Sequence, residues 1–170
     1  MKQIVLILFC TLMLTGCTFA YKNGSMAPAT ESATHKTSAS VSTEEIIPLN
    51  ASVYYGNENA DGFEIQIFQV ERLDTATLIE KLIEIGVLSE GTKVISEKLV
   101  GRCLHLDFNS EFKQHICSMG TSGEYIIIGS LVNTLLDNFQ DAIESVYITV
   151  NGEILESGHV IYDFELTHQE

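Results

Sequence analysis

Residues 121–152 read TSGEYIIIGSLVNTLLDNFQDAIESVYITVNG and contain most of the residues that we expect to form the core. Thr121 and Glu124 have the Thr-x-x-Glu spacing of a capping box, which predicts that a helix begins here. Apolar residues then recur at steps of three and four, so they share one stripe of the helix, and Asn133 lies off that stripe. They are Ile128, Leu131, Val132, Leu135 and Phe139.

The hydrophobic period changes to two after Phe139. Val146, Ile148 and Val150 alternate with more polar neighbours, which predicts a strand. Asn151-Gly152 follows and is typical of a tight hairpin turn. The helix therefore has a sheet beside it for its apolar stripe to cover.

The chain before this stretch contains a predicted antiparallel hairpin, formed by residues 51–55 and 63–70 around a loop of turn-forming residues. In its second strand, Phe68 and Val70 have the opposite phase to the apolar residues before them. We therefore expect either a β-bulge near Ile67 or burial of both faces of the strand.

Asp74 is a suitable N-cap for a helix over residues 75–85, and Gly86 is suited to end it. The order of elements is β-β-α, β-β-α, β-β, which predicts an α+β fold: a mainly antiparallel sheet with two helices on one side. The remaining predicted elements are strands 93–100 and 103–108, a helical turn at 110–117, and a final strand pair at 146–150 and 153–155.

The first residues have the features of an export signal. Ile4 to Leu14 is an apolar run behind Lys2, and it is shorter than the roughly 20 residues that a membrane-spanning helix needs. Residues 1–16 are therefore a predicted signal peptide. The segment ends Leu-Thr-Gly-Cys at Cys17, which resembles the lipobox of bacterial lipoproteins and implies lipid attachment at that cysteine; ordinary secretion with cleavage near Ala20 is the alternative.

Residues 17–50 are rich in Ser, Thr and Ala and contain few aliphatic residues. Such a segment buries too little apolar surface to offset its conformational entropy, so it is a predicted disordered tether. The folded domain is then expected to span residues 51–166. The lipidated Cys17 would hold that domain at the outer face of the bacterial cytoplasmic membrane.

Several pieces of the domain resemble the GerMN domain of sporulation and spore germination proteins. The pieces are residues 91–96 (GTKVIS), 104–112 (LHLDFNSEF), 130–135 (SLVNTL), 146–152 (VYITVNG), Gly158-His159 and Tyr162-Asp163. The resemblance implies a role in sporulation, germination or envelope assembly through contact with another protein or the cell wall. It supplies no catalytic residues.

Two pairs of polar residues are the candidates for chemistry. His105 and Asp107 share one face of a predicted strand, but residues two apart on a strand are almost 7 Å apart, too far to bind one metal ion together. His159 and Asp163 share a face only if their segment is helical. We therefore expect no catalytic residues, no metal site and no cofactor.

Cys103 and Cys117 are the two cysteines of the predicted domain. A strand over 103–108 would advance about 17 Å, and a helical 110–117 would return about 11 Å. The two sulfurs would then be near enough for a disulfide, which an oxidising exterior favours. Two free thiols are the alternative.

The chain is strongly acidic, with a formal net charge of -14, so we expect no nucleic-acid partner. From Gln114 to Glu170 there are nine acidic residues and no Lys or Arg. The sequence thus predicts a membrane-anchored, non-enzymatic interaction module outside the cytoplasm. The alternative is a small envelope hydrolase that acts on peptidoglycan.

Overall fold

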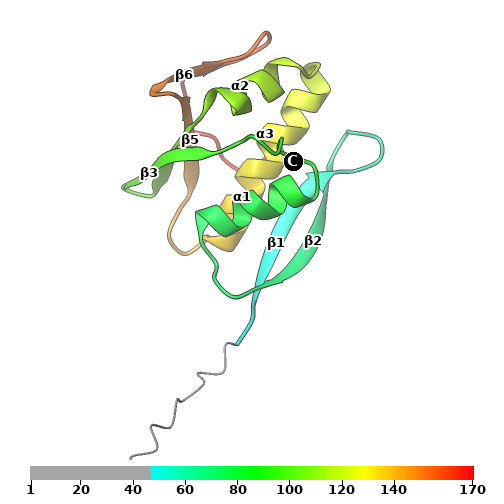
Figure 1. Ribbon diagram of the computed structural model, residues 1–170, viewed down its shortest axis with the longest axis vertical. Coiled ribbons are helices and arrows are strands. Elements are labelled where there is room, and N and C mark those ends of the chain that lie inside the picture. The colour runs from blue at the N-terminus through cyan, green and yellow to red at the C-terminus, as the bar shows by residue number, and fades with distance from the viewer. Residues whose placement is uncertain (1–46) are drawn as a thin grey trace, which may run out of the picture. The chain divides into compact units, whose positions relative to one another are not determined.

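A computed structural model describes residues 47–170, which contain seven strands and three helices (Figure 1). In chain order they are β1 (Leu49–Gly56), β2 (Phe63–Val70), α1 (Thr75–Glu84), β3 (Val94–Val100), β4 (Cys103–Phe108), α2 (Ser110–Cys117), α3 (Thr121–Asn138), β5 (Ser145–Val150), β6 (Glu153–Glu156) and β7 (Ile161–Tyr162). The predicted signal peptide, Cys17 and the tether up to residue 46 lie outside the described residues. β1 begins at Leu49, ahead of the domain start expected at residue 51.

The strands form a two-stranded sheet, β1-β2, and a five-stranded sheet in the order β3-β4-β5-β6-β7. All neighbouring strands are antiparallel except β4 and β5, which run parallel. The predicted α+β fold is confirmed, with two differences: the strands divide into two sheets, and residues 110–117 form a complete third helix. Parallel strands need a long crossover connection, and α2 and α3 together form it.

α3 is the central element of the domain. It contacts the small sheet through β1, the large sheet through β5, and both other helices. Figure 1 shows α3, in yellow, behind α1 and between β5 and β1. Every residue from Ile127 to Leu136 is buried, whereas the sequence predicts a single apolar stripe. α3 is enclosed by other elements, so Asn133 and Thr134 are buried along with the apolar residues.

The polar residues of α3 cover the free edge of β1. The Ser52 backbone N–H donates to Asn138 Oδ1 at 3.0 Å, and the Tyr54 N–H donates to Thr134 Oγ1 at 2.9 Å. The Tyr54 hydroxyl donates to Asp137. Burial, followed by this hydrogen bond, raises the pKa of Tyr54 to about 12, so the phenol remains a donor at physiological pH. A covered edge cannot pair with another strand.

Local signals in the sequence correctly predict the ends of α1 and the β5–β6 turn. Asp74 is the N-cap of α1 and accepts a hydrogen bond from the Thr77 N–H at 2.9 Å. Gly86 follows that helix with φ of 79°, and the β5–β6 turn has φ of 52° at Asn151 and 79° at Gly152. These are the left-handed conformations that a helix end and a tight hairpin turn require.

The predicted capping box at the start of α3 is wrong. The helix begins at Thr121, but its N-cap is Gly120, and no side chain caps it. Glu124 is turned into the domain, where it is 2% exposed. Within residues 47–170, no helix is both long enough and apolar enough to cross a membrane.

Candidate functional site

His105 and Asp107 each have a structural role in the large sheet. The His105 ring lies against that of Tyr147, with 5.0 Å between the ring centroids. Asp107 Oδ1 accepts hydrogen bonds from Thr149 Oγ1 and from the Gly152 N–H, both at 2.8 Å. Asp107 therefore supports the β5–β6 turn, and its carboxylate oxygen is engaged there.

His159 and Asp163 are both exposed and lie on either side of the short strand β7. The His159 backbone N–H donates to Ser157 Oγ at 3.0 Å, which orders the loop before that strand. Among residues 47–170, no three His, Cys, Asp or Glu side chains are grouped so that they could hold a metal ion.

The structure differs from the disulfide expectation, because Cys103 and Cys117 are both free thiols. Cys103 is buried at the start of β4, and burial raises the pKa of its thiol. Cys117 is exposed at the end of α2, with its Sγ 3.9 Å from the Glu156 carbonyl oxygen. Glu156 is on β6, which is separated from β4, the strand that carries Cys103, by β5. A disulfide needs Cα atoms within about 7 Å. The predicted lipid attachment at Cys17 lies outside the described residues.

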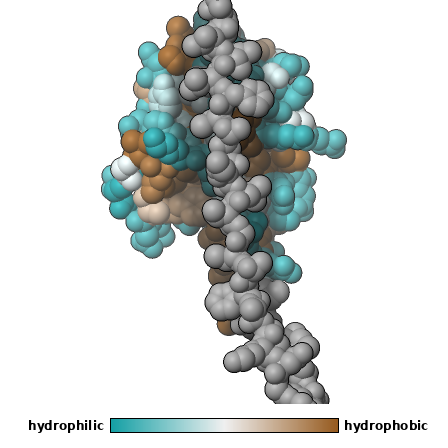
Figure 2. Space-filling view, turned by 60° about the vertical axis from the view of Figure 1, so that its left-hand side comes forward, coloured by the Kyte–Doolittle hydropathy of each residue, from teal (hydrophilic) through white to brown (hydrophobic). Residues whose placement is uncertain are grey.

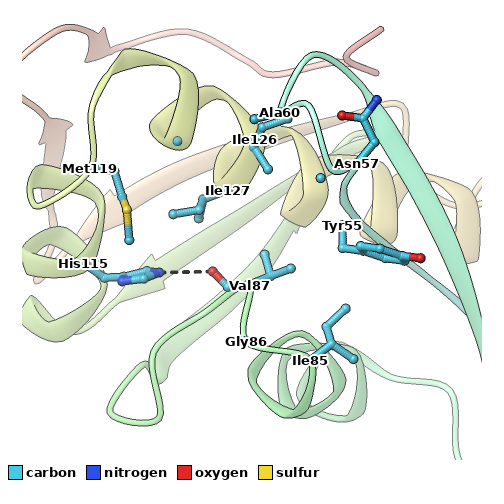
Figure 3. Close-up of a pocket in the computed structure, with 12 residues that line it drawn as sticks. Tyr55, Asn57, Ala60, Ile85, Gly86, Val87, His115, Met119, Ile126 and Ile127 are labelled. Atoms are coloured by element: carbon cyan, nitrogen blue, oxygen red, sulfur yellow. Dashed lines mark hydrogen bonds between the residues drawn. The ribbon is translucent and has the colours of Figure 1, made fainter.

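A mainly apolar cavity of about 350 Å³ lies between the β1–β2 loop and the ends of α1, α2 and α3 (Figure 3). His115 points into it, and its Nε2 is 3.1 Å from the Val87 carbonyl oxygen. The Tyr55 hydroxyl donates to Glu64 at 2.7 Å, and the Asn57 side chain bonds to Asp61. These polar side chains are engaged with other parts of the domain, so they do not converge on a common point in the cavity.

A second cavity, of about 260 Å³, lies between the start of α3 and the C-terminal segment, residues 160–169. We call it the Glu124 cavity, because Glu124 lines it. Oε1 of this residue accepts hydrogen bonds from Ser157 Oγ at 2.6 Å and from the Tyr162 hydroxyl at 2.7 Å. Burial, followed by the bond to Glu124, raises the pKa of Tyr162, so its hydroxyl keeps its proton. The sequence did not indicate this cavity, because Glu124 fits a capping box and was therefore expected to bond to the backbone at the start of the helix.

The free edge of β2 is accessible to solvent. Within the described residues β2 pairs only with β1, and Glu64–Ile67 are all exposed. The side chains of Ile65 and Ile67 are 50% and 56% exposed. We call Glu64–Ile67 the β2 surface.

The β2 surface explains the phase conflict in the sequence of this strand. The expected bulge near Ile67 is absent, because β1 and β2 pair in one continuous register. The expected burial of both faces is also wrong. Val70 is buried and Phe68 packs against the core, whereas Ile65 and Ile67 face solvent. The change of phase was the signal that could have identified this surface.

The free edge of β3 also exposes apolar residues, including Ile95 and Leu99. Figure 2 brings the β3 side of the molecule forward and shows hydrophobic patches between hydrophilic ones. The register shifts between Val94 and Ser96, and the strand contains Glu97 and Lys98. A bulge and charged residues are features that protect an edge from pairing. β2 has a regular register and a single charged residue, Glu64, so its edge is less protected.

The family model and the solved structures that match this chain indicate the same kind of domain. A family model named Germane, described as sporulation and spore germination, matches residues 52–156. The first GerMN domain of the sporulation protein GerM from Bacillus subtilis superposes with a TM-score of 0.57, at 20% identity, over 72% of this chain and 99% of that one. The tandem GerMN domains of the same protein give 0.54 at 22% identity, over 72% of this chain and 45% of that one. A comparison with curated proteins found no match.

Proposed function

The chain belongs to the Germane family of sporulation and spore germination proteins, and we propose that it acts as an extracytoplasmic module that binds another protein of the cell envelope through the β2 surface. The observation that carries this proposal is the free edge of β2, a strand of regular register that exposes two isoleucines, Ile65 and Ile67.

An added strand is the mode of recognition that suits this surface. A partner segment in extended conformation bonds to the free backbone groups of the edge, and alternate side chains supply specificity. Ile65 and Ile67 are two residues apart, so they lie on the same face of β2 and offer the partner an apolar strip. Because α3 covers the edge of β1, a partner strand can be added to the small sheet only beside β2.

We further propose that the mature chain begins at lipidated Cys17 and that the segment from Cys17 to the start of β1 at Leu49 tethers the domain to the outer face of the membrane. Tethering raises the effective concentration of a binding module near membrane partners. Intact-mass analysis of the purified mature protein is expected to show loss of residues 1–16 and the mass of a lipid on Cys17. A mature N-terminus beyond Cys17, without lipid, would contradict the anchor.

Binding is favoured over hydrolysis by the positions of the candidate residues. His105 and Asp107 are on β4, whereas His159 and Asp163 lie on either side of β7, and the Asp107 carboxylate is bonded to the β5–β6 turn. We therefore expect the purified protein to release no muropeptides from peptidoglycan. Release by the wild type that is lost in His105→Ala/Asp107→Ala would favour the envelope hydrolase.

Complementation in the source bacterium tests the role of the β2 surface. A strain that lacks the gene is given the wild type, Ile65→Lys/Ile67→Lys, or the control Ile154→Lys, and its heat-resistant spores and their germination are counted. Ile154 is 46% exposed on β6, so the control adds a charge at a similarly exposed isoleucine of the other sheet. We expect the control to restore function and the β2 variant to fail while folding normally by circular dichroism. Full function of the β2 variant would contradict the proposal.

A further inference from the structure

Glu124 is a buried carboxylate that the domain satisfies only in part. Oε1 accepts two hydrogen bonds, from Ser157 and Tyr162, whereas Oε2 accepts none from any described residue. Leaving a buried polar atom without a partner carries the full desolvation penalty of that atom, which is larger for a charged group. The Tyr162 hydroxyl already donates its single proton to Oε1, and the Ser157 hydroxyl is shared between Oε1 and the Val160 carbonyl oxygen, so neither serves Oε2.

Among residues 47–170, no Lys or Arg lines the cavity beside this carboxylate. From Gln114 to Glu170 the sequence has nine acidic residues and no Lys or Arg. In the described part of the chain, the salt bridges of this region are Arg102 with Glu144 and His168 with Asp137, and none of these residues lines the Glu124 cavity. The acidic surroundings favour the approach of a cation.

The other walls of the cavity are apolar and partly aromatic. Ile128, Val160 and Leu166 supply aliphatic surface, and the rings of Tyr162 and Phe164 lie 6.1 Å apart by their centroids. Aromatic faces attract cations as well as apolar groups. An apolar cavity of about 150 Å³ takes up benzene, so about 260 Å³ has room for a ring with a short substituent.

We propose that the Glu124 cavity binds a small primary amine with an apolar body, whose ammonium group donates to the free Oε2 of Glu124. The apolar body then lies between Ile128 on α3 and the aromatic residues of the C-terminal segment. Oε2 is enclosed, and Glu124 itself lines the cavity. This site is separate from the β2 surface and does not depend on partner binding there.

Benzylamine is the probe, and benzyl alcohol is its neutral counterpart of similar shape. Each is titrated into the folded protein while amide shifts are followed by NMR. We expect benzylamine to shift the amides of Tyr125, Ile128 and Tyr162 with saturation. Glu124→Gln keeps an acceptor for Tyr162 and removes the charge, so it should weaken benzylamine binding by about tenfold or more and leave benzyl alcohol binding unchanged.

Val160→Phe is a second variant that fills the cavity and leaves Glu124 and its partners in place. It should prevent binding of both probes, and it keeps the test decisive if Glu124→Gln unfolds the protein. Saturable benzylamine binding that survives Val160→Phe would overturn the proposal. So would shifts that map elsewhere on the domain, or binding of the amine and the alcohol with equal affinity to the wild type.

Discussion

Asn133 joins α3 to the C-terminal segment through both ends of its amide. Nδ2 donates to the Gln169 carbonyl oxygen at 2.9 Å, and Oδ1 accepts from the Gln169 N–H at 2.8 Å. Asn133→Ala leaves both backbone groups without this partner, so it should lower the free energy of unfolding by about 1–3 kcal/mol. Gln114→Ala, at an exposed position on α2, should change it by less than about 0.5 kcal/mol. Urea titration measures both, and equal small changes would contradict the role of Asn133.

Asp74 gives the stability of α1 a pH dependence. The Thr77 backbone N–H, followed by the Thr77 side chain, lowers the pKa of this carboxyl below its ordinary value of 3.8. Because the folded-state pKa is the lower one, ionised Asp74 stabilises the fold above pH 3.8, and the benefit is lost as the pH falls through the folded-state value. Asp74→Ala should cost about 0.5–2 kcal/mol at pH 7. This difference from the wild type should shrink in acid, and a difference independent of pH would contradict the assignment.

At the scale of elements, the contact between α3 and β2 depends on Gly129. A Cβ built on this residue would lie 2.8 Å from Phe63 Cε1 and closer still to Cζ. Gly129→Ala should therefore destabilise the domain by about 1–3 kcal/mol through overpacking, even though alanine favours the helix. Gly158→Ala has nothing within 4 Å of its new Cβ and should be nearly neutral. Thermal unfolding of the two variants measures their stabilities. A Gly129→Ala variant that is more stable than the wild type would contradict this prediction, because it would mean that the Phe63 ring moves away without cost.

The elements α3, β5 and β2 show how far the sequence alone can predict this fold. Apolar periodicity placed α3 and β5, because a helix or strand must present its apolar residues to a neighbour. It did not predict that α3 is enclosed on all sides, because Asn133 and Thr134 look like solvent-facing residues until their backbone partners, far away in sequence, are known. In β2 the sequence predicts a bulge or burial of both faces, because sequence reasoning assumes that alternating apolar residues are buried.

At the scale of the whole molecule, local sequence patterns do not predict the topology of the sheets. Whether β4 and β5 run parallel depends on where α2 and α3 return the chain, and no residue pattern specifies that direction. The Glu124 cavity depends in the same way on residues 124 and 162 meeting across the fold. The tight turns and the cap of α1 were predictable, because their signals are contained in a few consecutive residues.

The central claim is that this domain binds an envelope protein through the β2 surface. Site-specific photocrosslinking in living cells tests it most directly, with p-benzoylphenylalanine placed at Ile67 of the full-length chain and, as a control, at Ile154. These positions are 56% and 46% exposed and lie on different sheets. We predict one discrete protein adduct from position 67, none from position 154, and loss of the adduct when Ile65→Lys is added. The absence of an adduct at position 67, or the same adduct at both positions, would contradict the claim.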